Sequence, residues 1–260
     1  MIPYLIEIGP LKIPSYGFML MMAFMTNYFL LTRELKRLGK DPDMAGDLVF
    51  WAAIGGILGS KIYYMMDNYE TFIADPLSMI FSGSGLVFLG GLAGGMIAVT
   101  LYLRKKREPW LAWTDIVAPF LILGYAIGRI GCFLVGDDYG VACDLPWGMT
   151  FPRGAPPTFT PVHPTQMYET LAGIGIFAVL WKLRVWNRPA GSLFALYLIL
   201  AGTERFLIES IRTNEKYLFG LTGAQIISTI MFVIGAFLII KLGKTSDHDS
   251  AAGAETAKPH

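Results

Sequence analysis

Long runs of apolar residues alternate with short polar segments along most of the chain. Each run is close to the roughly 20 residues that an α-helix needs to cross a lipid bilayer. The runs cover residues 15–33, 46–66, 86–103, 111–136, 166–181, 191–209 and 221–240. This pattern predicts an all-α polytopic membrane protein with about seven transmembrane helices, contained in a single domain over residues 1–244.

The composition and the placement of charge agree with a membrane protein. Of the 260 residues, 54% are hydrophobic and 16% are charged, and the mean hydropathy is +0.50. Soluble domains carry about 25% charged residues. Lysine and arginine gather in alternate loops, as in the basic run Arg104–Arg107. The positive-inside rule therefore predicts an extracytoplasmic amino terminus and a cytoplasmic carboxyl terminus.

Two segments stand apart from the apolar runs. Residues 137–165 form a long extracytoplasmic loop with too many prolines for regular structure, and we expect this loop to cover a site. Residues 245–260 are small and polar, which predicts a disordered cytoplasmic tail. Cys132 and Cys143 lack metal-ligand spacing, so they are either two free thiols or one disulfide. A net charge of +1, with no basic patch among aromatic residues, gives no indication of nucleic-acid binding.

Glycines four residues apart recur in the apolar runs. Such spacing allows the backbones of two helices to approach closely in lipid. A second interpretation is a thin helix wall past which a lipid gains access. The pairs are Gly55/Gly59, Gly90/Gly94, Gly91/Gly95 and Gly124/Gly128.

Charged residues inside the predicted spans are the features that most need an explanation. Lys61, Arg129 and Arg205 all lie within apolar runs, where a buried arginine costs at least about 2.5–3.5 kcal/mol. Arg205, Glu209 and Arg212 follow one another at i, i+4 and i+7 and therefore share a helical face. One interpretation is an internal ion pair between Arg205 and Glu209. The other is that Arg129 and Arg205 converge on an anion, because a guanidinium matches the oxygens of a phospholipid phosphate.

Further polar residues allow both a structural and a functional interpretation. His163 precedes a helix that begins near Pro164, and it is either a cap or packing residue or part of a site. Gln166 and Glu169 add polar groups to the first turn of that helix. Lys61 either contacts a headgroup or extends its ammonium group to the membrane interface.

Several segments, in order, resemble the prolipoprotein diacylglyceryl transferase family. They are "SYGFML" (15–20), "GSKIYY" (59–64), "FLGGLAGG" (88–95), "DIVAPF" (115–120), "GRIGCFLVGDDYG" (128–140), "HPTQMYE" (163–169), "ERFLIESIRTNE" (204–215) and "LTGAQIIS" (221–228). The resemblance covers most of the chain.

The resemblance implies an enzyme of the bacterial plasma membrane. Such an enzyme moves the diacylglyceryl group of phosphatidylglycerol to the lipobox cysteine thiol of a preprolipoprotein and releases glycerol phosphate. The implied partners are phosphatidylglycerol, the lipobox-containing preprolipoprotein and membrane lipid, with no metal, no cofactor and no nucleic acid.

The resemblance and the charge pattern together give a set of candidate site residues. Arg129 matches the family's signature arginine and would hold the phosphate. The expected catalytic residues are Arg129, Arg205, Glu209 and Asp137. The expected substrate-binding residues are Tyr16, Lys61, Gly90, Gly91, Gly140, His163, Gln166 and Arg212.

The chain also departs from the family pattern. The family histidine in the third span, to which a base-like role is assigned, is Leu89 here, and leucine accepts no proton. Cys132 replaces an asparagine, Asp137 a glutamate and Ala201 a tyrosine. The alternatives to a divergent transferase are therefore a paralogue with a different acceptor and a non-catalytic phospholipid-binding membrane protein.

Overall fold

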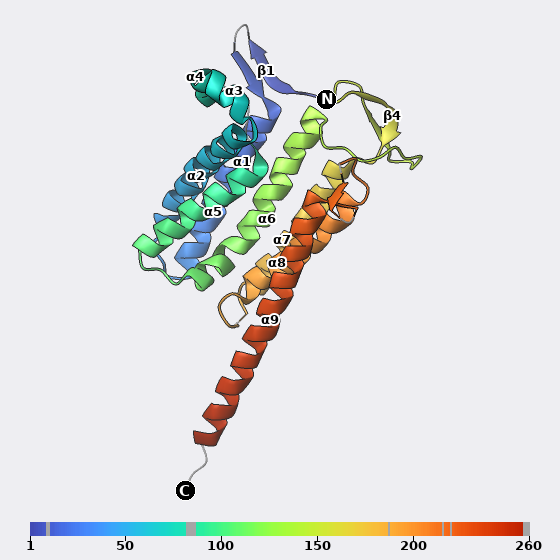
Figure 1. Ribbon diagram of the computed structural model, residues 1–260. Helices are drawn as coiled ribbons and strands as arrows, with labels where there is room; N and C mark the ends of the chain where they lie inside the picture. Colours follow the sequence, from blue (N-terminus) through green and yellow to red (C-terminus); the bar gives the residue numbers. More distant parts are fainter. Residues whose placement is uncertain (9–10, 82–86, 187, 215, 219, 257–260) are drawn as a thin grey trace. The chain divides into compact units, whose positions relative to one another are not determined.

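The computed structural model describes residues 1–8, 11–81, 87–186, 188–214, 216–218 and 220–256. Each apolar run lies mainly in a helix (Figure 1). These helices are α1 (Ser15–Arg37), α2 (Met44–Asp67), α5 (Phe88–Lys105), α6 (Trp110–Val135), α7 (Thr165–Leu183), α8 (Ser192–Glu209) and α9 (Gly223–Thr256). The chain divides into two compact units, one of residues 1–27 with 114–260 and one of residues 28–113.

Some of these helices are long and apolar enough to cross a membrane. Within the described ranges they are α2, α6 and the part of α9 from Gly223 to Gly243. Helix α8 has a similar length but carries Glu204, Arg205 and Glu209 within its 18 residues. The structure thus confirms a mostly helical chain with apolar helices of membrane-spanning length. The count of seven spans and the orientation stay predictions.

Close glycine packing organises the unit of residues 28–113. A Cβ atom added to Gly59 would lie 2.2 Å from the Gly90 carbonyl oxygen, and one added to Gly94 would lie 2.2 Å from the Gly55 carbonyl oxygen. Helices α2 and α5 therefore touch along their backbones, and the packing interpretation of these glycines is confirmed. Two short helices that the apolar pattern did not predict, α3 (Tyr69–Ala74) and α4 (Pro76–Phe81), follow α2.

An apolar core and a tertiary helix cap position the helices of the other unit. Ile122, Leu180, Leu193 and Ala201, from α6, α7 and α8, form a buried cluster. Asp115 of α6 accepts hydrogen bonds from the backbone N–H groups of Gly191 and Phe194, at 2.7 and 2.8 Å. Because the first N–H groups of a helix have no partner within it, this carboxylate anchors the start of α8 on α6.

Three short hairpins correct the expectation of an entirely α-helical chain. They pair β1 (Tyr4–Ile8) with β2 (Leu11–Pro14), β3 (Met149–Phe151) with β4 (Thr158–Val162), and β5 (Lys216–Leu218) with β6 (Leu221–Thr222), all antiparallel. The expectation that the proline-rich loop has no regular structure was therefore wrong. Pro161 lies in β4, whose pairing with β3 is irregular, and an irregularity of this kind tolerates a residue without an N–H donor.

Cys132 and Cys143 are both free thiols, so the disulfide alternative is wrong. Helix α9 continues to Thr256, within the segment whose composition predicts disorder. A helical end is marginal in water without packing. Disorder of the tail stays a prediction, and residues 257–260 lie outside the described residues.

Candidate functional site

Arg129 lies in the last third of α6 and is engaged by groups from several segments. Its Nη1 lies 2.7 Å from Asp138 Oδ2, and its Nε lies 3.2 Å from Glu169 Oε2. The guanidinium also lies over the ring of Tyr125, with Cζ 5.0 Å from the ring centroid. Its side chain is 14% exposed, so these partners offset the cost of placing a permanent charge in the interior.

Glu169 of α7 is the central acceptor of the site. Its side chain is completely buried, and its Oε1 lies 2.6 Å from Arg205 Nη1. The phenol of Tyr125 donates a hydrogen bond of 2.9 Å to the same oxygen. One carboxylate therefore joins arginines of α6 and α8.

The ion pairs continue around a closed circuit. Arg205 Nη2 lies 2.9 Å from Glu209 Oε2, and Arg212 Nε lies 3.6 Å from that oxygen. Arg212 Nη2 then lies 2.5 Å from Asp138 Oδ1, which returns the circuit to Arg129. We call this alternating set, Asp138–Arg129–Glu169–Arg205–Glu209–Arg212, the ion-pair ring.

Glu209 also ties the ring to the segment before α9. Its Oε1 accepts hydrogen bonds from Asn214 Nδ2 at 2.7 Å and from Thr222 Oγ1 at 2.8 Å. Thr222 belongs to β6 and directly precedes α9. The ring therefore depends on α6, α7, α8 and the start of α9 together.

Three guanidinium groups and three carboxylates make the ring formally neutral. Burial alone raises the pKa of Asp138, but the charges of Arg212 and Arg129 more than offset it, so this pKa lies below its ordinary value. Asp137 differs, because burial and then the neighbouring charge of Asp138 raise its pKa. No hydrogen-bond donor in the described part of the chain reaches Asp137 Oδ1.

Arg212 has unused hydrogen-bonding capacity. Its side chain is only 5% exposed. Its Nε and Nη1 are buried and have no hydrogen-bond acceptor among the described residues. The nearest carboxylate oxygens lie at 3.6 Å from Nε and 3.7 Å from Nη1, too far for a good hydrogen bond. Two buried nitrogens of one guanidinium are therefore left without a hydrogen-bond acceptor among the described residues.

A crossing of three backbone segments supports the ring. The Gly140 N–H donates to the His163 carbonyl oxygen at 2.9 Å, and Gly140 also bridges to Arg212. A Cβ atom at Gly140 would lie 2.6 Å from the Ile211 carbonyl oxygen. Thr165 Oγ1 donates a 2.7 Å hydrogen bond to the Asp138 carbonyl oxygen. Gly140 is thus required by this close approach, next to two members of the ring.

The structure brings together only part of the predicted site. Arg129, Arg205, Glu209 and Arg212 all belong to the ring, and the internal ion pair between Arg205 and Glu209 is present. Gln166 is fully buried, and its amide donates to the Asp137 carbonyl oxygen.

Other predicted residues lie outside the ring. The His163 imidazole faces Tyr168, with Nδ1 3.3 Å from the phenol oxygen, so in the described contacts its backbone, not its ring, supports the site. Tyr16 is the second residue of α1 and lies against Gly131, where an added Cβ would be 3.1 Å from the tyrosine ring.

Lys61, Gly90 and Gly91 belong to the other unit. Lys61 Nζ donates to the Met79 carbonyl oxygen at 3.3 Å. A Cβ atom on Gly91 would lie 2.6 Å from Ser60 Oγ, so Gly91 serves helix packing. Contact of these three residues with a substrate stays a prediction.

The sequence argument missed Glu169 and Asp138 as members of the site. Glu169 lies one turn after Gln166, and this i, i+3 spacing signals a shared helical face. Asp138 directly follows the aspartate that was predicted to be catalytic, and a positive φ of 62° turns it toward the arginines.

Cys132, Asp137 and Asp138 offer ligand atoms within 4.8 Å of one another, a grouping of the kind that holds metal ions. Both carboxylate oxygens of Asp138 are already paired with guanidinium nitrogens. In this arrangement Asp138 therefore has no oxygen free of a guanidinium to offer to a metal ion.

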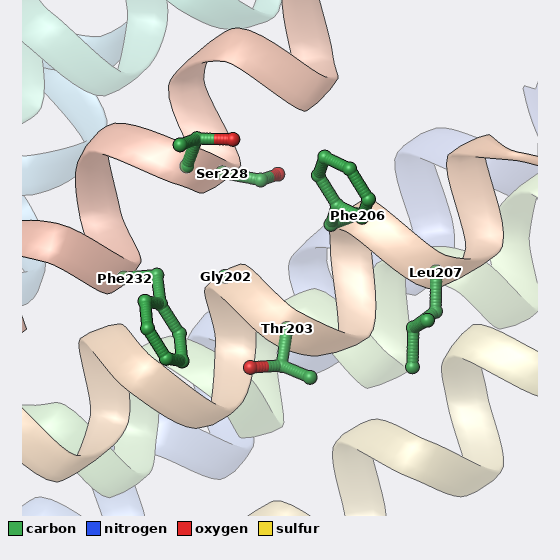
Figure 2. Close-up of a pocket in the computed structure, with 7 residues that line it drawn as sticks. Gly202, Thr203, Phe206, Leu207, Ser228 and Phe232 are labelled. Atoms are coloured by element: carbon green, nitrogen blue, oxygen red, sulfur yellow. The ribbon is translucent and has the colours of Figure 1, made fainter.

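A separate groove of about 210 Å³ lies between α8 and α9 (Figure 2). It is lined by Gly202, Thr203, Phe206, Leu207, Ser228, Thr229 and Phe232. None of these residues belongs to the ion-pair ring. The groove is apolar and has no charge to offer to a headgroup.

This fold and this site define a helical membrane protein with a buried, arginine-rich ion-pair ring. A model of the prolipoprotein diacylglyceryl transferase family matches residues 3–241. A phosphatidylglycerol–prolipoprotein diacylglyceryl transferase of Idiomarina loihiensis is 36% identical over 247 residues, which cover 91% of each chain. Relatives with the same name from Coxiella burnetii and Nitratidesulfovibrio vulgaris are 36% and 34% identical, over 91% and 92% of this chain and 94% and 93% of their own. The chain belongs to the prolipoprotein diacylglyceryl transferase family.

Proposed function

We propose that this chain transfers the diacylglyceryl group of phosphatidylglycerol to the cysteine thiol of a lipobox-containing preprolipoprotein. The observation that carries the proposal is the pair of buried N–H groups on Arg212 that have no hydrogen-bond acceptor among the described residues, in a ring with Arg129 and Arg205. A phosphate is a bidentate acceptor that satisfies two such donors at once. The names of the relatives supply the donor and the acceptor.

The chemistry requires the site to stabilise a growing negative charge. The thiolate sulfur attacks the glycerol carbon of the diacylglyceryl group, and the bond from that carbon to a phosphate oxygen breaks. The electron pair remains on the phosphate oxygen of the departing glycerol phosphate, so negative charge grows there as the bond breaks. Arg212, Arg129 and Arg205 then bind the leaving group more tightly than the donor, and this difference lowers the barrier.

The membrane arrangement belongs to the same proposal. Seven spans, an extracytoplasmic amino terminus and a location in the bacterial plasma membrane are supported by the apolar runs and by the alternation of basic loops. The ring would then lie toward the extracytoplasmic face, where the loop of residues 137–165 begins.

Purified protein tests the proposal directly. Phosphatidylglycerol labelled in its acyl chains is mixed with a lipobox peptide, and a peptide with serine in place of the cysteine serves as the control. Transfer of label to the cysteine peptide alone, with release of glycerol phosphate, is the expected result. A protein that binds phosphatidylglycerol but labels neither peptide would contradict the transferase activity.

A second candidate keeps the phosphatidylglycerol donor and changes the acceptor. It is favoured by Leu89, which supplies no proton acceptor where the family resemblance implies a histidine. This candidate predicts glycerol phosphate release that does not depend on the lipobox peptide but requires another membrane component.

A further inference from the structure

Glu204 is a buried carboxylic group that the ion-pair ring does not use. It lies on α8 next to Arg205 and is 8% exposed. Its Oε1 is buried and receives no hydrogen bond from any residue that the structure describes. A buried polar group without a partner is costly, so its presence calls for a reason.

The surroundings of Glu204 place it at the boundary between the apolar core and the ring. Ala201, one helical turn earlier, belongs to the core cluster with Ile122 and Leu180. The charged groups within electrostatic reach of Glu204 are Glu169, Arg205 and Arg129. The phenol groups of Tyr125 and Tyr197 also interact with it electrostatically.

A count of charges explains why this carboxyl group differs from the others. The three arginines of the ring are already paired with Asp138, Glu169 and Glu209. An ionised Glu204 would be a fourth negative charge among three positive ones, in an interior that hydrates it poorly. A protonated Glu204 leaves the site neutral, and it provides an O–H donor on the residue next to Arg205 in α8.

We propose that Glu204 rests as the neutral acid and donates its proton to the leaving phosphate oxygen during the transfer. This inference rests on the proposed function and adds a catalytic residue to it. As the carbon–oxygen bond breaks and the sulfur–carbon bond forms, the electron pair stays on the phosphate oxygen, which takes the proton. Glu204 becomes a carboxylate and is reprotonated from solvent, to which the thiol lost its own proton before the attack. Over one turnover, a single proton passes from thiol to glycerol phosphate.

The first test compares Glu204→Gln with the wild-type protein. Glutamine keeps the shape of the side chain but transfers no proton, so kcat should fall about 100-fold or more, with the KM for phosphatidylglycerol within about twofold. The decline of wild-type kcat on the alkaline side should disappear in the variant. Glu34→Gln, which removes a buried helical carboxylate of the other unit, is the matched control and should keep wild-type activity.

A donor with a better leaving group separates proton donation from a structural role. A phosphorothioate analogue of phosphatidylglycerol releases a less basic group, which needs the proton less. This analogue should therefore recover most of the activity that Glu204→Gln loses with the natural donor. An equal loss with both donors would overturn the role of Glu204.

Infrared difference spectroscopy gives a readout that does not depend on activity. The wild-type protein should show the carbonyl stretch of a protonated carboxyl group that is missing in Glu204→Gln. Absence of that band in a folded wild-type protein would refute a neutral Glu204. Wild-type protein without any thiol transfer would instead refute the proposed function, and with it the reaction in which Glu204 acts.

Discussion

Replacing Arg212 with lysine tests the residue of the site whose hydrogen-bonding capacity is least satisfied. Lysine keeps one positive charge and can still pair with Asp138, which lies 2.5 Å from Arg212 Nη2. It has no planar fork, so it cannot supply the two N–H groups that are buried without acceptors. If phosphate takes both, Arg212→Lys loses at least one hydrogen bond to a charged group, worth about 1.5–3 kcal/mol. That loss corresponds to roughly a 10- to 100-fold decrease in kcat/KM for phosphatidylglycerol.

The assay follows labelled transfer to the lipobox peptide over a range of phosphatidylglycerol concentrations. Arg153→Lys makes the same chemical change at an exposed arginine and should leave kcat/KM unchanged. Thermal unfolding in detergent establishes that both variants are folded. An Arg212→Lys protein with wild-type kcat/KM would refute the role of Arg212 as a bidentate phosphate ligand.

Three further outcomes are expected. Leu89→His should raise thiol transfer, because it restores the proton acceptor that the family resemblance implies; an unchanged rate in a correctly inserted protein would contradict this. The pKa of Asp138 is lowered, so its contribution to stability is complete above the ordinary aspartate pKa of about 3.9 and is lost as the pH falls below it. The wild-type Tm should therefore fall more steeply below about pH 4 than the Tm of Asp138→Asn, and parallel curves would contradict the ion pairs. Gly140→Ala should destabilise the fold by about 1–3 kcal/mol, because its Cβ would lie 2.6 Å from a carbonyl oxygen, whereas Gly128→Ala has open space and should be neutral in the same unfolding assay.

The helices could be predicted because their signal is local. A run of apolar residues is read from consecutive positions, and α6 at Trp110–Val135 matches the predicted run 111–136 almost residue for residue. The hairpin of β3 and β4 was missed for the opposite reason. Its strands are short, and the proline in β4 argues against a strand unless the pairing is known to be irregular there.

The candidate site was predictable in its cations and in Glu209, but not in Glu169 or Asp138. A buried arginine stands out in any apolar run, so Arg129 and Arg205 could be selected from the sequence alone. Their shared partner Glu169 is 36 residues from Arg205 in the chain, and it lies beyond the first turn of α7, where no local signal relates it to either arginine. Only the packing of α7 against α8 shows that this carboxylate is central.

The formal neutrality of the ring agrees with a reaction that must release a negatively charged product, glycerol phosphate. An arginine cluster without carboxylates would hold glycerol phosphate, the more negative product, too tightly to release it. In the ring each arginine is already paired with a carboxylate. A bound phosphate therefore gains only the difference in free energy between its own ion pair and the one that it displaces, so the product can still dissociate. Arg212 is also paired with a carboxylate, but two of its nitrogens have no hydrogen-bond acceptor among the described residues. Phosphate binding therefore begins at Arg212, where competition from carboxylates is weakest. Glu209→Gln removes one competing carboxylate, so it should tighten glycerol phosphate binding and slow turnover because the product leaves more slowly. The dissociation rate of glycerol phosphate from the Glu209→Gln variant, compared with its kcat, tests this explanation. Weaker binding of glycerol phosphate to a folded variant would refute it.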